Sequence, residues 1–174
     1  MTVVVLGCGY VGLELSRQLT GEGHDVVGVR RSDEGLTAVE ATGASAVQAD
    51  VTDPDALTAV PDADALVFAA SSGGRGAEAA RRVYVEGLET VIEQFGAREN
   101  PPDRLVYTSS TGVYGDHGGD WVDESTPLDP QTGSPSRRPP STASTAPSHA
   151  SRASTARTGT DWIGILRDPS PRGT

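Results

Sequence analysis

Apolar residues along this chain form short continuous runs that alternate with helically spaced stretches. The β-branched run at 2–6, "TVVVL", ends at a glycine, and Val11, Leu15 and Leu19 then follow at helical spacing. Further strand patterns recur, with helical patterns between them, at 25–29, 45–50, 64–71 and 103–110. Strands and helices that alternate with short connections predict an α/β protein with a Rossmann-like, doubly wound parallel sheet in three layers.

Local signals mark the ends of the predicted helices. Ser32 is a suitable N-cap for the second helix, and Asp53, followed by Pro54, suits the start of a short third helix. From 76 to 95 the apolar positions keep the spacing of one long helix, and Gly96 closes the pattern. These signals divide the chain into compact strand and helix units.

The composition changes abruptly after residue 132. Residues 133–157 hold seven Ser, five Ala, four Pro, four Arg and three Thr, without Asp, Glu, Leu, Ile or Val. Such a segment has no apolar face to bury, so we expect it to be disordered. A strand pattern returns at 158–167. We therefore predict a Rossmann domain at 1–132, a low-complexity segment at 133–157, and a sixth strand with a tail at 158–174.

The net charge of the chain limits the classes of molecule that we expect it to bind. Its 24 acidic and 14 basic residues give a net charge of −10, which disfavours nucleic acid and anionic membranes. All basic residues are Arg, and this acidic, lysine-free composition resembles that of proteins from a high-salt cytoplasm. Cys8 is the only cysteine, so no internal disulfide forms. Since no apolar run reaches the length of a membrane span or a signal segment, we expect a cytoplasmic protein.

The sequence "GCGYVG" at 7–12 lies between the first strand and the first helix, where a dinucleotide fingerprint belongs. In that fingerprint the first glycine permits a tight turn, the second admits a pyrophosphate, and the third lets helix and strand pack closely. The anion then lies on the helix N-terminus. A glycine-rich turn without a ligand is the alternative. The predicted cofactor contacts in this turn are Gly7, Gly9, Tyr10, Val11 and Gly12.

Two arginines, Arg30 and Arg31, end the second strand. An NAD site places a carboxylate there to hold the ribose hydroxyls. Two guanidinium groups suit a 2′-phosphate instead, so the sequence favours NADP over NAD. The alternative is that both are solvated surface arginines.

The next strand ends supply further candidates. Asp50 and the amide of Val51 follow the third strand, where they suit an adenine edge. Ala69, Ala70 and Ser71 end the fourth strand, where small residues leave room for the cofactor. These assignments depend on the glycine motif, since Asp50 alone is equally consistent with a turn residue.

Several stretches together resemble a known family. "ADVTDP", "VFAAS", "YTSSTGVYGDHG" and "WVDESTPLDP" look like the NAD-dependent epimerase/dehydratase proteins, which are extended and atypical short-chain dehydrogenases/reductases. The resemblance runs from residue 1 to about residue 130 and resumes at 158–167. Val5 and Leu6 replace the usual Thr-Gly, which points to the atypical branch. The resemblance implies an oxidoreductase acting on a small molecule such as a nucleotide sugar, and it leaves open a homodimer built through the helix at 76–95.

The resemblance also implies a catalytic stretch. By position, Ser110 would polarise the substrate oxygen, and the candidate catalytic residues are Ser110, Thr111 and Tyr114. In the family, a Tyr-x-x-x-Lys pair about twenty residues downstream supplies the acid/base. This chain has no tyrosine after Tyr114 and no lysine, so that pair is absent. The alternative is that these hydroxyls only satisfy backbone groups at a strand end.

The family's acid/base helix would fall where the low-complexity segment lies. Ser, Pro, Arg, Ala and Thr are the residues that GC-rich codons give when read out of frame. One hypothesis is therefore a frame-shifted stretch in a longer, truncated enzyme, and the other is a genuine linker. Two other functions are alternatives to an oxidoreductase. The chain is either a non-catalytic NADP-binding or sensor module, or an inactive truncated or frame-shifted remnant of such an enzyme.

Overall fold

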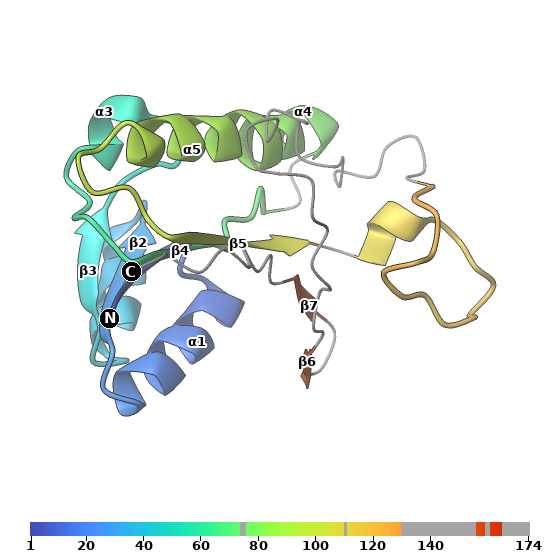
Figure 1. Ribbon diagram of the computed structural model, residues 1–174, viewed down its shortest axis with the longest axis horizontal. Coiled ribbons are helices and arrows are strands. Elements are labelled where there is room, and N and C mark those ends of the chain that lie inside the picture. The colour runs from blue at the N-terminus through green and yellow to red at the C-terminus, as the bar shows by residue number, and fades with distance from the viewer. Residues whose placement is uncertain (74–75, 110, 130–155, 159–160, 165–174) are drawn as a thin grey trace, which may run out of the picture.

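A parallel five-stranded sheet forms the centre of the molecule (Figure 1). The structure is a computed structural model that describes residues 1–73, 76–109, 111–129, 156–158 and 161–164. The parallel strands lie in the order β3-β2-β1-β4-β5, and each adjacent pair is parallel. They are β1 (Thr2–Leu6), β2 (Asp25–Arg30), β3 (Ser45–Gln48), β4 (Ala65–Phe68) and β5 (Arg104–Ser109). This order confirms the predicted Rossmann-like fold.

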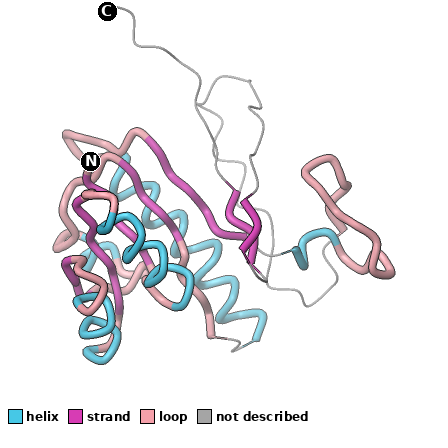
Figure 2. Tube along the Cα trace, turned by 90° about the horizontal axis from the view of Figure 1, so that it is seen from below, coloured by secondary structure: helices cyan, strands magenta, loops and turns pink. Residues whose placement is uncertain are grey.

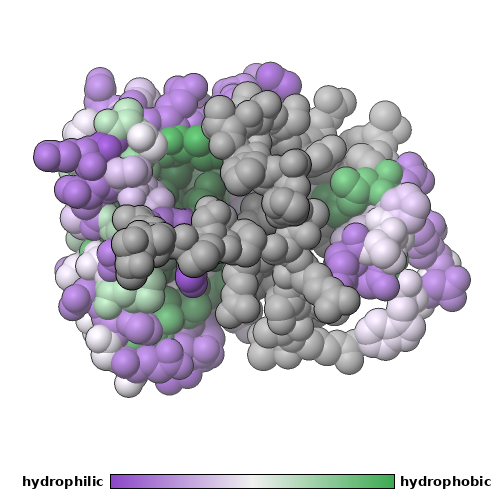
Figure 3. Space-filling view, viewed as in Figure 1, coloured by the Kyte–Doolittle hydropathy of each residue, from purple (hydrophilic) through white to green (hydrophobic). Residues whose placement is uncertain are grey.

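Helices cover both faces of the sheet. Side chains of β1 alternate between two buried clusters, with Val3 and Val5 in one and Val4 and Leu6 in the other. The first cluster lies under α1 (Tyr10–Gly21) and α2 (Asp33–Glu40), and the second under α3 (Pro54–Leu57) and α5 (Leu88–Gly96). Figure 3 shows hydrophilic residues along the outer rim of this domain and hydrophobic residues between α5 and the sheet. The three predicted layers are present.

Both predicted N-caps are confirmed. The Ser32 hydroxyl accepts a hydrogen bond from the Gly35 amide at the start of α2 (3.3 Å). The Asp53 carboxylate accepts from the amides of Asp55 and Ala56 at the start of α3. Each cap satisfies amides that have no partner within the helix.

The long helix after β4 differs from the prediction of one regular helix. It consists of α4 (Gly76–Arg81), a π-helical segment η1 (Arg82–Gly87) and α5 (Leu88–Gly96). Apolar residues spaced three and four apart indicate which face of a helix is buried. They do not reveal a turn whose hydrogen bonds follow the π-helical i→i+5 pattern.

Two short strands extend the sheet beyond β5 (Figure 2). They are β6 (Ala156–Thr158) and β7 (Asp161–Gly164), which pair antiparallel to each other, and β7 pairs antiparallel with β5. A strand within 158–167 is thus present, but its direction departs from the parallel pattern. β6 begins inside the segment that we expected to be disordered, and residues 130–155 lie outside the described residues.

Candidate functional site

The predicted binding residues come together at one edge of the sheet. Leu6, the last residue of β1, lies level with Val29 of β2 and Phe68 of β4. The carboxyl ends of β1, β2 and β4 therefore lie side by side. The glycine turn follows the first, the two arginines lie at the second, and the small residues follow the third. The strand order reverses between β1 and β4, because β2 and β3 lie on one side of β1 and β4 and β5 on the other. Ligands of open α/β sheets bind outside the carboxyl ends of the strands at such a point.

The glycine turn is pinned closely to both neighbouring strands. Gly7 has φ +78°, and a Cβ atom there would fall 2.5 Å from the backbone N of Ala70. The amides of Gly7 and Cys8 both donate to the Val29 carbonyl, at 3.2 and 3.0 Å. At Gly12 a Cβ would lie 3.0 Å from Cγ1 of Val5. These positions therefore need glycine for the tight turn and the close helix packing.

The N-terminus of α1 is open toward the same edge. Gly9 precedes the helix, no side chain caps the first turn, and that turn holds no acidic residue. The side chain of Tyr10 is exposed, whereas Val11 is half-buried. Amides at such a terminus carry the positive end of the helix dipole and bind anions. A Cβ at Gly9 would lie 3.1 Å from Nη1 of Arg30 and 3.8 Å from the Gly7 carbonyl oxygen, so a side chain there would crowd this helix terminus.

Arg30 lies against this turn. Its Nη1 donates to the Cys8 carbonyl at 3.0 Å, and a Cβ on Gly9 would lie 3.1 Å from the same nitrogen. A Cβ on Gly35, at the start of α2, would lie 3.1 Å from Cζ of Arg30. Arg30 is half-buried and hydrogen-bonded beside the N-terminus of α1, so it is not a fully solvated surface arginine.

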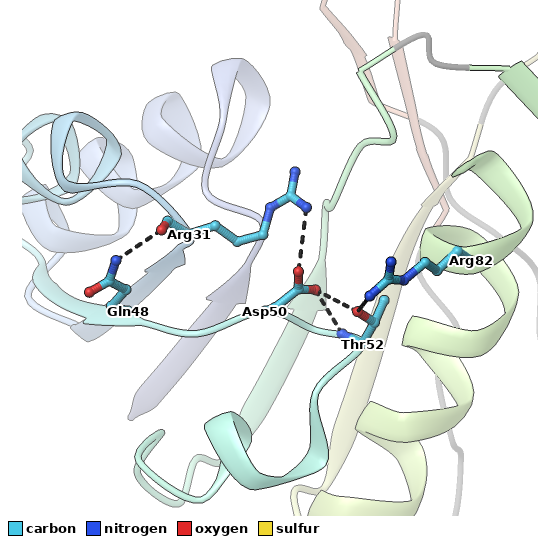
Figure 4. Close-up of polar contacts among 5 residues, drawn as sticks. All are labelled: Arg31, Gln48, Asp50, Thr52 and Arg82. Carbon is cyan, nitrogen blue, oxygen red and sulfur yellow. Dashed lines mark hydrogen bonds and ion pairs between the residues drawn. The ribbon is translucent and has the colours of Figure 1, made fainter. Parts of the chain in front are cut away.

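Arg31 turns instead toward the end of β3. Its Nη1 lies 3.4 Å from Oδ2 of Asp50, and its backbone carbonyl accepts from Nε2 of Gln48 at 2.9 Å (Figure 4). The Arg31 side chain is 55% exposed and that of Asp50 is 32% exposed. The two consecutive arginines therefore have different partners on opposite sides of the strand end.

Asp50 also holds the turn that follows β3. Its Oδ1 accepts from the amide of Thr52 (3.0 Å) and from the Thr52 hydroxyl (2.9 Å). Partial burial alone would raise the pKa of Asp50, but the hydrogen bonds from Thr52 and the nearby Arg31 outweigh it, and the pKa lies below its usual value. Asp50 is thus a charged turn residue with one oxygen directed to Arg31. Val51, the next residue, is buried, and the contact of its amide with adenine stays a prediction.

Sequence reasoning missed Arg82. This residue opens η1, and its Nη2 donates to the Thr52 hydroxyl at 3.4 Å. Figure 4 shows Arg31 and Arg82 reaching the Asp50–Thr52 turn from different elements. The contact joins residues thirty positions apart, and no local spacing in the sequence indicates it.

Small residues line the end of β4. Ala69 and Ala70 are half-buried, and the Ala69 amide donates to the Leu6 carbonyl at 2.8 Å. The exposed Ser71 accepts from the Gly73 amide at 3.2 Å. The Tyr84 hydroxyl, from η1, accepts from the Ser72 amide at 3.4 Å. These small side chains therefore lie beside the glycine turn and take up little space there.

The predicted catalytic stretch is only partly described. Ser110, the residue that follows β5, lies outside the described residues, and Thr111 begins the 3-10 helix η2 (Thr111–Tyr114). Tyr114 is half-buried, and its carbonyl lies 2.8 Å from Nε2 of His117. The catalytic roles of these residues stay predictions.

The described residues contain neither a metal-binding cluster nor a membrane-spanning helix. Within the ranges that the structure describes, no group of three or more His, Cys, Asp or Glu could hold a metal ion. In the same ranges, no helix is long and apolar enough to cross a membrane.

The strand order, the glycine turn at the β1 end and the open helix terminus define a dinucleotide-binding Rossmann protein. The sequence model of the NAD dependent epimerase/dehydratase family matches residues 3–163. The chain belongs to this family, as its resemblance in sequence indicated.

Known relatives support this assignment. Protein YeeZ of Escherichia coli K12 is 34% identical over 139 residues, which cover 76% of this chain and 48% of YeeZ. The chain therefore spans about half the length of the curated relatives it matches. A structure described as a putative NAD-dependent epimerase/dehydratase from Bacillus halodurans is 29% identical, with a TM-score of 0.57 over 69% of this chain and 56% of that one.

A more distant structure shares the fold. UDP-glucose 4-epimerase from Bifidobacterium longum, solved in complex with NAD+ and UDP, has a TM-score of 0.63 at 20% identity. The match covers 76% of this chain and 44% of the epimerase. At this identity the likeness shows the fold alone.

Proposed function

We propose that this chain is the NADP-binding part of an epimerase/dehydratase-family oxidoreductase. The pyrophosphate would lie on the N-terminus of α1 at Gly9, and the 2′-phosphate would contact Arg30 and Arg31. The adenine edge would face Asp50 and the amide of Val51. When bound, the cofactor supplies a nicotinamide ring that accepts or donates hydride.

One observation carries the proposal, namely the position of Arg30 beside Gly9. A dinucleotide that lies on the glycine turn brings its adenosine ribose to the end of β2. Arg30 is already held there by the Cys8 carbonyl, and Arg31 follows it with much of its side chain exposed. No carboxylate follows β2 directly, so this position lacks the side chain that binds the ribose hydroxyls in an NAD site.

The proposed substrate is a small molecule of the nucleotide-sugar class, because the family includes epimerases and dehydratases. In this reaction the Ser110 hydroxyl would polarise the oxygen of the substrate carbon that exchanges hydride. The family's tyrosine and lysine are absent from these 174 residues, so the acid/base would have to come from another group.

That absence favours a second candidate function, a module that binds NADP without turning over a substrate. It predicts saturable NADPH binding together with no oxidation of NADPH above background, with or without a nucleotide sugar. It also predicts that Ser110→Ala leaves NADPH affinity unchanged. A rate that depends on substrate and falls in Ser110→Ala would favour the oxidoreductase.

Gly9→Ala tests the cofactor site with little harm to the fold. The added methyl group would lie 3.1 Å from Nη1 of Arg30 and at ordinary contact distance, 3.8 Å, from the Gly7 carbonyl oxygen, and the φ of Gly9 is −89°. It would nevertheless occupy the space where the pyrophosphate approaches. Gly21→Ala is the matched control, because a Cβ there meets nothing within 4 Å.

Isothermal titration with NADPH provides the measurement. The wild type and Gly21→Ala should bind with the same affinity, and Gly9→Ala should bind about tenfold more weakly, which corresponds to about 1.4 kcal/mol. Wild-type protein that is folded yet shows no saturable heat with NADPH or NADH would refute the proposed function.

A further inference from the structure

Arg31 already has an anionic partner in the protein. Its Nη1 lies 3.4 Å from Oδ2 of Asp50, and the two residues belong to the ends of adjacent strands. A charge-assisted hydrogen bond between guanidinium and carboxylate is usually about 2.7–2.9 Å long. The observed pair is therefore loose, and the exposed Arg31 can turn to another anion.

We propose that Asp50 sets the preference between NADP and NAD, because its carboxylate competes with the 2′-phosphate for Arg31. This inference rests on the proposed function. In the protein without cofactor, Asp50 holds Arg31 at the end of β3. NADP must displace this contact, whereas NAD, which has a hydroxyl at the same place, leaves it in position.

The two oxygens of Asp50 have separate tasks. Oδ1 accepts both hydrogen bonds from Thr52 and fixes the turn after β3. Oδ2 faces Arg31. Loss of Arg31 to a phosphate therefore costs Asp50 one contact without opening the turn, so the exchange changes a charge pair and not the fold.

The charge of Asp50 is maintained at neutral pH. The hydrogen bonds from Thr52 and the nearby Arg31 hold the pKa of this carboxyl below its usual value, although burial acts in the opposite direction. A 2′-phosphate can therefore contact Arg31 only by breaking an ion pair with a charged carboxylate. The uncharged ribose hydroxyl of NAD does not require that pair to break.

Asp50→Asn separates these effects. The amide oxygen can still accept from Thr52, and the amide nitrogen, as a donor, cannot hold Arg31. Loss of an adenine contact would weaken NADPH and NADH equally, so the informative quantity is the ratio of their dissociation constants. We expect the preference for NADPH to rise about fivefold.

Asp25→Asn is the matched control. It changes the net charge by the same amount, and its exposed side chain starts β2 at the opposite edge of the sheet. We expect it to leave the ratio unchanged. Asp50→Ser, with a hydroxyl that can accept from the Thr52 amide, is a second neutral variant with the same predicted direction if Asp50→Asn does not fold.

A double-mutant cycle tests whether Asp50 acts on the cofactor preference through Arg31. Arg31→Gln should lower the preference for NADPH, and adding Asp50→Asn to it should then change the ratio less than twofold. Competition is overturned if Asp50→Asn leaves the ratio unchanged, if its effect is equally large without Arg31, or if Asp25→Asn has the same effect. Wild-type protein that binds neither cofactor would instead overturn the proposed function, and this inference with it.

Discussion

Gly7 and Ala70 pack so closely that a Cβ on Gly7 would fall 2.5 Å from the backbone N of Ala70. Gly7 also has φ +78°, a conformation that L side chains rarely adopt. Since the obstacle is backbone, it cannot move aside as a side chain would. The contact fixes the glycine turn against β4, where the proposed cofactor would lie.

Gly7→Ala should therefore be strongly destabilising. The left-handed conformation costs about 1–2 kcal/mol and the steric conflict about 1–3 kcal/mol more, so we expect a total loss of about 3 kcal/mol. Urea denaturation followed by circular dichroism measures this free energy of unfolding. Gly21→Ala should lose nothing, and equal stability of the two variants would contradict the observed packing.

The buried thiol of Cys8 should react slowly in the folded protein. Cys8 and Ser16 are both fully buried and hydrogen-bonded to each other at 3.3 Å. Burial raises the pKa of the Cys8 thiol, and the opposing effects of Ser16 and Arg30 are smaller. Labelling with a disulfide reagent should be fast only in urea. Rapid labelling of the native protein would show that the glycine turn opens.

The same thiol should make stability depend on alkaline pH. The unfolded thiol ionises at about pH 8.5, whereas the folded thiol has a higher pKa and retains its proton longer. Stability should thus fall as the pH rises from the unfolded pKa toward the folded one. Cys8→Ala should be less stable at pH 7 but lack this fall, and identical pH slopes for both proteins would contradict the prediction.

Arg98 should contribute more to stability than the exposed arginines. Its guanidinium donates to the Leu57 carbonyl (2.9 Å) and to Asp62 (3.1 Å), and it lies 3.8 Å from the centre of the Phe95 ring. Arg98→Ala should lose about 2 kcal/mol of unfolding free energy. The control is Arg17→Ala, whose surface pair with Glu14 should matter little. Equal melting temperatures for both variants would contradict this.

Arg82 should influence cofactor binding without affecting cofactor choice. It contacts Thr52, which in turn donates to Asp50, so Arg82→Gln should weaken NADPH and NADH alike, by about twofold to threefold. Its neighbour Arg81 pairs with Glu86 at 3.4 Å, and Arg81→Gln should change neither affinity. Equal effects of both variants would indicate a general loss of positive charge.

The fold could be predicted because local signals agree with it. The run at 2–6, the glycine turn and the apolar face of the next helix all indicate the same strand-turn-helix unit, and Ser32 and Asp53 mark helix starts that the structure confirms. Such features depend on neighbouring residues, which the sequence shows directly.

The site was less predictable because its contacts join distant segments. Arg30 and Arg31 looked equivalent, yet side chains alternate along a strand, so one contacts the Cys8 carbonyl and the other Asp50. The contact between Arg82 and Thr52 depends on how η1 packs against the segment that follows β3, which no spacing reveals. The antiparallel direction of β7 likewise depends on the path of the chain after β5.

Phosphorus NMR of NADP+ titrated with the protein tests the central claim most directly, because it resolves the pyrophosphate from the 2′-phosphate. We predict that both signals shift or broaden with the wild type. With Arg30→Gln/Arg31→Gln, the pyrophosphate signal should still respond and the 2′-phosphate response should be largely lost. A 2′-phosphate signal that does not respond to folded wild-type protein, or that responds equally without these arginines, would contradict the account.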